Sequence, residues 1–175
     1  MTDAILRLAS GDDAETVHRF IRALAAYERD PDAVKATPES LREQLAAERP
    51  PFECLLAEVS GEPRGFALFF HNYSTWRGRQ GLYLEDLFVV ESWRGKGLGR
   101  RLLAELARLA IDRGCARLDW VVLEWNQPAI EFYQSLRAEV LRGWLPCRLQ
   151  GDALRALADA GAAGAVSSAD SPSGD

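Results

Sequence analysis

The most constraining feature of this chain is an apolar strand that runs into a glycine-rich turn and then into an amphipathic helix. Residues 82–90 are strand-like, Gly95, Gly97 and Gly99 follow, and leucines at helical spacing predict a helix over about 98–113. Such a junction directs several backbone N–H groups and the positive end of a helix dipole at one place, and glycines let an anion approach closely. The junction therefore predicts a phosphate-binding turn.

Two common phosphate-binding patterns do not fit this turn. A P-loop requires Ser or Thr after its Gly-Lys pair, whereas Gly97 follows Gly95-Lys96 here. A dinucleotide-binding fingerprint has GxGxxG, whereas these glycines are spaced GxGxG. What remains is Arg94-x-x-Gly97-x-Gly99, together with the alternative that the glycines only allow a tight strand-to-helix turn.

The other periodic segments predict an α/β domain whose central sheet is mixed and mostly antiparallel. Helices are expected over 12–28, from Thr37 to the stop at Pro50-Pro51, and over about 128–136. Strand-like runs lie at 4–9, 52–59, 65–73, 82–90 and 117–123, and one or two further strands are expected within 140–149. A helical turn or two is expected near 152–158. Residues 1–160 are predicted to form one domain, and residues 161–175, rich in Ala, Gly, Ser and Asp, a disordered tail.

Charge and composition argue against several classes of protein. The net charge of the 175 residues is −5, so the chain lacks the basic footprint of nucleic-acid binders. No apolar run approaches the roughly 20 residues of a membrane helix, and no leader-like segment starts the chain. The three cysteines form no CxxC pair, which indicates neither a disulfide framework nor a metal site. We therefore expect a cytoplasmic protein without nucleic-acid, membrane or metal partners.

Three segments, in order along the chain, resemble the GNAT superfamily of N-acetyltransferases. Arg94–Arg100 is similar to its Q/R-x-x-G-x-G/A pyrophosphate loop, Leu82–Val89 to the strand LYLEDFFV, and Glu124–Tyr133 to the segment EWNxPxxxFY. Ala25–Glu28 resembles an AxYE helix end. The likeness is closest to the spermidine/spermine and thialysine N-acetyltransferases and covers about residues 4–149.

The resemblance implies a fold, a reaction and an assembly. The GNAT fold has a mixed, mostly antiparallel sheet with flanking helices, splayed around the CoA site. The implied reaction is direct transfer of an acetyl group, within a ternary complex, from the co-substrate acetyl-CoA to a primary amine of a small molecule: a diamine, a polyamine or a lysine-like amine such as thialysine. A homodimer is also implied.

The resemblance further implies residue roles. Tyr133 and Glu85 would be catalytic, with Tyr133 beside the thioester sulfur, and the amine would be faced by Tyr27, Glu28 and Glu85. The groups implied to hold acetyl-CoA are Leu87, Phe88 and Val89 on the strand, Arg94, Gly95, Lys96, Gly97, Leu98, Gly99 and Arg100 in the turn, and Asn126, Pro128 and Ala129 beyond it.

The chemistry of these residue types agrees with the implied roles. An alkylammonium must lose a proton before it can attack, and a carboxylate such as Glu85 can attract it and accept that proton. A phenol can protonate the departing thiolate, and a backbone N–H can stabilise the carbonyl oxygen. Each residue also has a structural interpretation: Tyr133 as a packed aromatic, Asn126 as a helix N-cap. The role of Asp86, adjacent to Glu85 and expected on the opposite face, stays open.

Two departures from the pattern bear on the substrate. Arg137 stands where the polyamine group has glycine, and Arg142 stands where an acidic residue would bind a second cationic centre. These changes favour shorter amines or lysine-like side chains over long polyamines. Two other functions remain as alternatives: acetylation of a protein or peptide amine, and non-catalytic binding of acyl-CoA.

Overall fold

The structure is a computed structural model that describes residues 3–165. The chain divides into two compact units, Met1–Leu123 and Glu124–Asp175. Within the described residues, none of the helices combines the length and the hydropathy needed to cross a bilayer.

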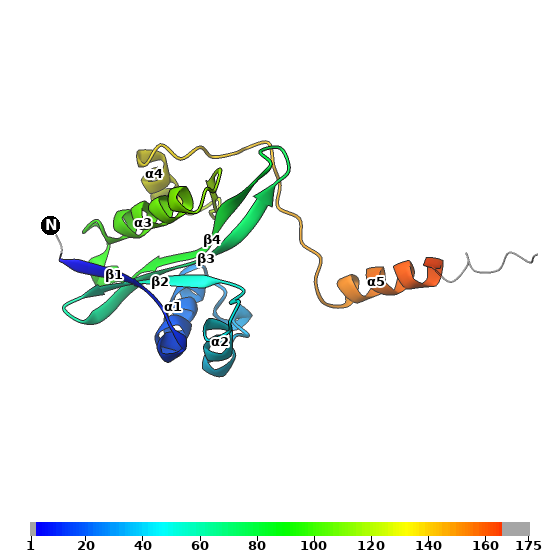
Figure 1. Cartoon of the computed structure of the whole chain (residues 1–175), viewed down its shortest axis with the longest axis horizontal. Coiled ribbons are helices and arrows are strands. Elements are labelled where there is room, and N and C mark those ends of the chain that lie inside the picture. The colour runs from blue at the N-terminus through cyan, green and yellow to red at the C-terminus, as the bar shows by residue number, and fades with distance from the viewer. Residues whose placement is uncertain (1–2, 166–175) are drawn as a thin grey trace, which may run out of the picture. The chain divides into compact units, whose positions relative to one another are not determined.

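The first unit is built on a five-stranded sheet in which neighbours along the chain are also neighbours in space (Figure 1). The first four strands pair antiparallel and the last pairs parallel with its neighbour, which confirms the mixed, mostly antiparallel sheet. The strands are β1 (Ala4–Leu8), β2 (Glu53–Val59), β3 (Glu62–Ser74), β4 (Arg79–Val89) and β5 (Leu118–Asp119). The strand expected over 117–123 is therefore much shorter than predicted.

Helices cover both faces of this sheet. Figure 1 shows α1 (Ala14–Tyr27) and α2 (Pro38–Leu45) on one face and α3 (Leu98–Asp112) on the other. Short 3-10 turns precede or link them at η1 (Gly11–Asp13), η2 (Pro31–Ala33) and η3 (Glu91–Trp93). Thr37 caps α2 as expected, since its hydroxyl accepts from the backbone N–H of Ser40. The helix ends at Leu45, several residues before the proline pair expected to stop it.

Each face has its own apolar core. Under α1, Val17 and Phe20 are buried, and the Phe20 and Phe66 rings stack with centroids 5.5 Å apart. On the other face, α3 buries Leu98, Leu102 and Leu106 almost completely. Burial of one such side chain stabilises the fold by about 1.5–3 kcal/mol. The buried leucines of α3 therefore hold this helix, and the turn that precedes it, against the sheet.

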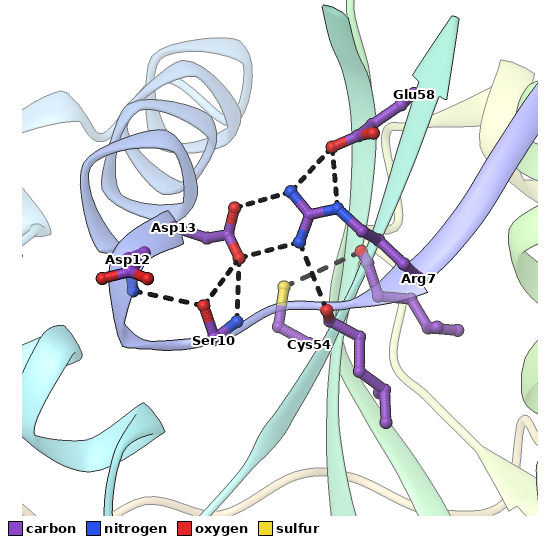
Figure 2. Close-up of polar contacts among 8 residues, drawn as sticks. Arg7, Ser10, Asp12, Asp13, Cys54 and Glu58 are labelled. Carbon is purple, nitrogen blue, oxygen red and sulfur yellow. Dashed lines mark hydrogen bonds and ion pairs between the residues drawn. The ribbon is translucent and has the colours of Figure 1, made fainter. Parts of the chain in front are cut away.

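A polar network ties the first strand to the first helix. Figure 2 shows Arg7 of β1 between Asp13, which precedes α1, and Glu58 of β2. The guanidinium donates to both carboxylate oxygens of Asp13 at 2.7 and 2.8 Å and to Glu58 at 2.9 Å. Asp13 also accepts from the backbone N–H of Ser10 at 2.8 Å. The Arg7 guanidinium holds the pKa of the Asp13 carboxyl below its usual range.

The second unit contains two helices, α4 (Gln127–Ser135) and α5 (Gly151–Ala165). The strands expected within 140–149 are wrong, because these residues adopt no regular structure. Strand pairing requires a ladder partner, and Pro146 has no N–H to donate to one. Helix α5 starts near the helical turn expected at 152 but extends to Ala165, so residues 161–165 of the expected tail are helical. Residues 166–175 of that tail lie outside the described residues.

Candidate active site

A bulge in β4 sets the positions of the two adjacent carboxylates. Leu68 pairs with Asp86 and Phe69 pairs with Leu84, so Glu85 is an additional residue without a partner opposite on β3. Asp86 therefore shares the face of its partner Leu68, which belongs to the core under α1. Because Leu68 and Phe69 are adjacent on β3, their partners Asp86 and Leu84 lie on opposite faces although they are two residues apart on β4.

The charges of Glu28 and Glu85 both act on Asp86, and we call Glu28, Glu85 and Asp86 the acidic cluster. Burial, together with the smaller effect of the charges of Glu85 and Glu28, raises the pKa of Asp86 to about 7. Partial desolvation also raises the pKa of Glu28 at the end of α1. Glu85 itself is exposed. A cation among these groups would relieve their mutual repulsion, so the acidic cluster suits an ammonium ion.

The outer edge of β4 is open beyond the acidic cluster. Strand β5 pairs with β4 only at Leu82 and Tyr83, and no other strand among residues 3–165 pairs with that edge. Leu87, Phe88 and Val89, assigned from sequence to the pantetheine arm, lie on this open part of the strand. Unpaired N–H and C=O groups at a sheet edge can bind an extended ligand in the manner of an added strand.

The glycine turn has the geometry that anion binding requires. Gly95 and Gly97 have φ of 71° and 85°, a region that favours glycine, and no other atoms lie within 4 Å of a Cβ built on either. Gly97 is the N-cap of α3, and no side chain caps the helix there. The first backbone bond of the helix is donated by Arg101 to Gly97. The N–H groups of the first helical turn, including Leu98, thus point to a place where an anion fits.

The side chains of this turn also contact its surroundings. The ammonium of Lys96 lies 4.6 Å from the centroid of the Trp93 ring. The guanidinium of Arg94 lies 4.8 Å from the ring centroid of Tyr27, on the last turn of α1, and 5.6 Å from that of Phe88. The turn assigned to the cofactor and the helix end assigned to the amine are therefore in contact.

The second unit carries the remaining sequence-assigned residues on α4. Asn126 is the buried N-cap of this helix, and its amide oxygen accepts from Ala129 at 3.4 Å, which confirms the capping interpretation. Pro128 occupies the first turn, where its missing N–H costs nothing. Tyr133 lies near the end of α4, half-buried, with its ring 5.4 Å from that of Phe132.

Within the first unit, the structure brings together most of the residues that the sequence assigned. Asp86, whose role the sequence left open, lies with them and is the most strongly desolvated member of the acidic cluster. The sequence feature that could have pointed to Asp86 is the presence of a carboxylate within an otherwise apolar strand. Among the described residues, no group of three or more His, Cys, Asp and Glu side chains is arranged to hold a metal ion.

Comparison with known proteins connects this geometry to a family. The acetyltransferase (GNAT) family model matches residues 17–137. A thialysine N-epsilon-acetyltransferase of Bos taurus is 39% identical over 169 residues, covering 90% of this chain and 99% of the relative. An L-ornithine N5-acetyltransferase of Arabidopsis thaliana is 32% identical, covering 87% of this chain and 86% of the relative.

The fold has counterparts among solved structures. An integron cassette protein from the mobile metagenome of V. cholerae superposes with a TM-score of 0.74 at 28% identity, covering 90% of this chain and 99% of that protein. Strands β2 to β5, the open edge of β4 and the glycine turn before α3 all lie within residues 17–137, which the family model matches. The chain therefore belongs to the GNAT family of acetyltransferases and is an acetyl-CoA-dependent enzyme.

Proposed function

We propose that this enzyme acetylates the primary amine of a small molecule, of the size of a diamine or a lysine-like amino acid. The observation that carries the proposal is the acidic cluster at the bulge of β4, beside the open strand edge. It supports recognition of a compact ammonium ion. The relatives named for thialysine Nε and L-ornithine N5 acetylation support the same class of acceptor.

The glycine turn and the strand edge fit acetyl-CoA. We assign the pyrophosphate to the backbone N–H groups of residues 95–100, because Gly95 and Gly97 have no side chain and no other atoms lie within 4 Å of a Cβ built on either. We assign the pantetheine arm to the backbone of Leu87, Phe88 and Val89. The thioester supplies an activated acetyl group when bound. The other groups proposed to hold acetyl-CoA are assigned from the resemblance alone; they are Asn126, Pro128 and Ala129.

The acidic cluster prepares the amine. Glu28 and Glu85 attract the ammonium, with Tyr27 beside them on α1, and Glu85 accepts its proton directly or through water. Asp86 adds to this function, since a carboxylate whose pKa is about 7 exchanges protons readily near neutral pH. A neighbouring backbone N–H of β4 stabilises the carbonyl oxygen as negative charge develops on it.

Tyr133 is the general acid in this proposal. Its Oη gives a proton to the departing sulfur, which would otherwise leave as a thiolate. The support is the resemblance of Glu124–Tyr133 to the family segment. Without a metal or a covalent intermediate, the amine attacks the thioester directly.

Two arginines bear on the size of the amine that the enzyme accepts. Arg137 and Arg142 disfavour a second cationic centre, so short amines and lysine-like amines are expected to react better than spermine.

We further propose a cytoplasmic homodimer. Support for the homodimer comes from the resemblance of residues 4–149 to the spermidine/spermine and thialysine N-acetyltransferases.

The experiment is a thiol-release assay with acetyl-CoA against a panel of amines. The panel contains thialysine, ornithine, lysine, putrescine, spermine and a lysine-containing peptide. Cys147 is exposed, so a blank without amine corrects for the thiols of the chain. We expect the highest kcat/KM on a lysine-like amine or a short diamine. A preference for the peptide would replace the small-molecule proposal with peptide acetylation, and no turnover on any amine would contradict it.

A further inference from the structure

Arg94 lies where the proposed cofactor turn meets the proposed amine site. Its guanidinium lies over the ring of Tyr27 at 4.8 Å and near that of Phe88 at 5.6 Å. Its Nε donates to the backbone carbonyl of Val89 at 3.0 Å. One side chain thus contacts the last turn of α1, which precedes Glu28, and the end of β4, which leads into the glycine turn.

The backbone of Arg94 is also engaged within the protein. Its N–H donates to the carbonyl of Glu91 at 3.0 Å and closes the short turn η3. The Arg94 N–H therefore holds the start of the glycine turn to η3, and the Arg94 Nε holds it to the end of β4. This residue begins the glycine turn, so its position sets where the following N–H groups lie.

Tyr27 lies at the C-terminal end of α1. Helix α1 ends at this residue, the N–H of Glu28 donates to Leu24 at 2.8 Å, and the chain then reverses at Arg29, whose φ is 68°. Contact with the planar guanidinium of Arg94 contributes to the position of this helix end.

We propose that Arg94 is a positioning residue that couples the acetyl-CoA and amine sites through its contact with Tyr27. This inference rests on the proposed function, because it assumes that the glycine turn binds acetyl-CoA and that the end of α1 faces the amine. Loss of the Tyr27 ring loosens the start of the glycine turn and weakens CoA binding. Loss of Arg94 loosens the end of α1 and weakens amine binding. Linkage then requires that acetyl-CoA and the amine change each other's affinity by the same factor.

A double-mutant cycle tests the coupling. CoA affinity is measured by calorimetry for the wild type, Tyr27→Leu, Arg94→Gln and the double variant. A cation–π contact at an exposed site corresponds to about a twofold to fivefold change in an equilibrium constant. We expect Tyr27→Leu to weaken CoA binding by about this factor, and to have no further effect once Arg94 is replaced. Tyr27→Phe keeps the aromatic ring and should therefore bind CoA with the affinity of the wild type, unlike Tyr27→Leu.

Steady-state kinetics supply a second readout. At saturating acetyl-CoA, Arg94→Gln should raise the KM for the amine more than it lowers kcat, although Arg94 is not assigned to the amine. The matched control is Arg19→Gln, because Arg19 lies 5.5 Å from the ring centroid of Phe20 on the same helix but has no assigned part in either site. Arg19→Gln should leave both CoA affinity and amine KM unchanged.

The outcomes separate this inference from the function on which it rests. Wild-type CoA affinity in Tyr27→Leu, or full additivity of the two substitutions, would overturn the coupling while leaving the enzyme assignment intact. Failure of the wild type to bind CoA would overturn the proposed function, and the coupling with it. Thermal unfolding followed by circular dichroism establishes that each variant is folded; Tyr27 is 37% exposed, which makes its replacement tolerable.

Discussion

Replacing Asp86 by Asn should change how the stability of the fold depends on pH. The fold raises the pKa of this carboxyl from 3.8 to about 7, mainly by burial. Below pH 3.8 the carboxyl is protonated in both the folded and the unfolded states. As the pH rises toward 7, the unfolded state loses its proton first, so the free energy of unfolding falls. Above about pH 7 the loss is complete.

The magnitude follows from the shift. One pKa unit corresponds to about 1.4 kcal/mol, so a shift of about 3 units amounts to about 4 kcal/mol. Asn has the same shape and no charge, so Asp86→Asn should gain about this much relative to the wild type between pH 4 and pH 8. This is a large part of the roughly 5–15 kcal/mol that stabilises a typical domain.

Urea unfolding at a series of pH values measures the difference. Asp32→Asn, which removes an exposed carboxylate, is the matched control. Activity should fall in Asp86→Asn even as stability rises, as expected when a costly group is retained for function. A stability difference that stays constant from pH 4 to pH 8 would show that Asp86 is not desolvated as described.

Two further substitutions test other parts of the account. Tyr133→Phe keeps the ring but removes the proton, so kcat should fall by about 10²–10⁴-fold with little change in acetyl-CoA affinity; nearly full kcat on the best amine would make Tyr133 a packing residue. Asp13→Asn should cost about 1–2 kcal/mol at neutral pH, allowing for the partly exposed Arg7, and the loss should shrink as the pH falls below 3.8, since the stabilisation from a lowered carboxyl pKa is full above the unfolded value and disappears as the pH falls through the folded value. Urea unfolding at pH 7 and pH 3 checks this, and an equal loss at both values would refute it.

Features governed by neighbouring residues could be predicted from the sequence. Thr37 and Asn126 cap their helices as expected, because a cap needs only a side-chain oxygen and a backbone N–H a few residues away. Gly114 follows α3 with a φ of 69°, as expected of a glycine that ends a helix. The glycine turn is of this kind too, since a strand, a turn and a helix follow one another directly.

Features governed by distant partners could not be predicted in the same way. The bulge at Glu85 arises from pairing with β3, and the sequence of β4 alone reads as a regular strand. The apolar residues of 140–149 suggested strands, but apolar residues form strands only where a pairing edge is available. The desolvation of Asp86 likewise depends on its burial within the fold, which spacing along the chain does not reveal.

Binding of CoA by Gly97→Val tests the central claim most directly, that the glycine turn before α3 holds the pyrophosphate of acetyl-CoA. The substitution places a side chain where we expect phosphate, and replaces a residue whose φ is 85°. Gly78→Val is the matched control, because Gly78 has a φ of 61° and an open Cβ position in the turn between β3 and β4. Charge-assisted hydrogen bonds contribute about 1.5–3 kcal/mol each, so loss of one or two should weaken binding by at least about tenfold. We predict that calorimetry shows this loss for Gly97→Val and wild-type affinity for Gly78→Val. Wild-type affinity in a folded Gly97→Val would contradict the account.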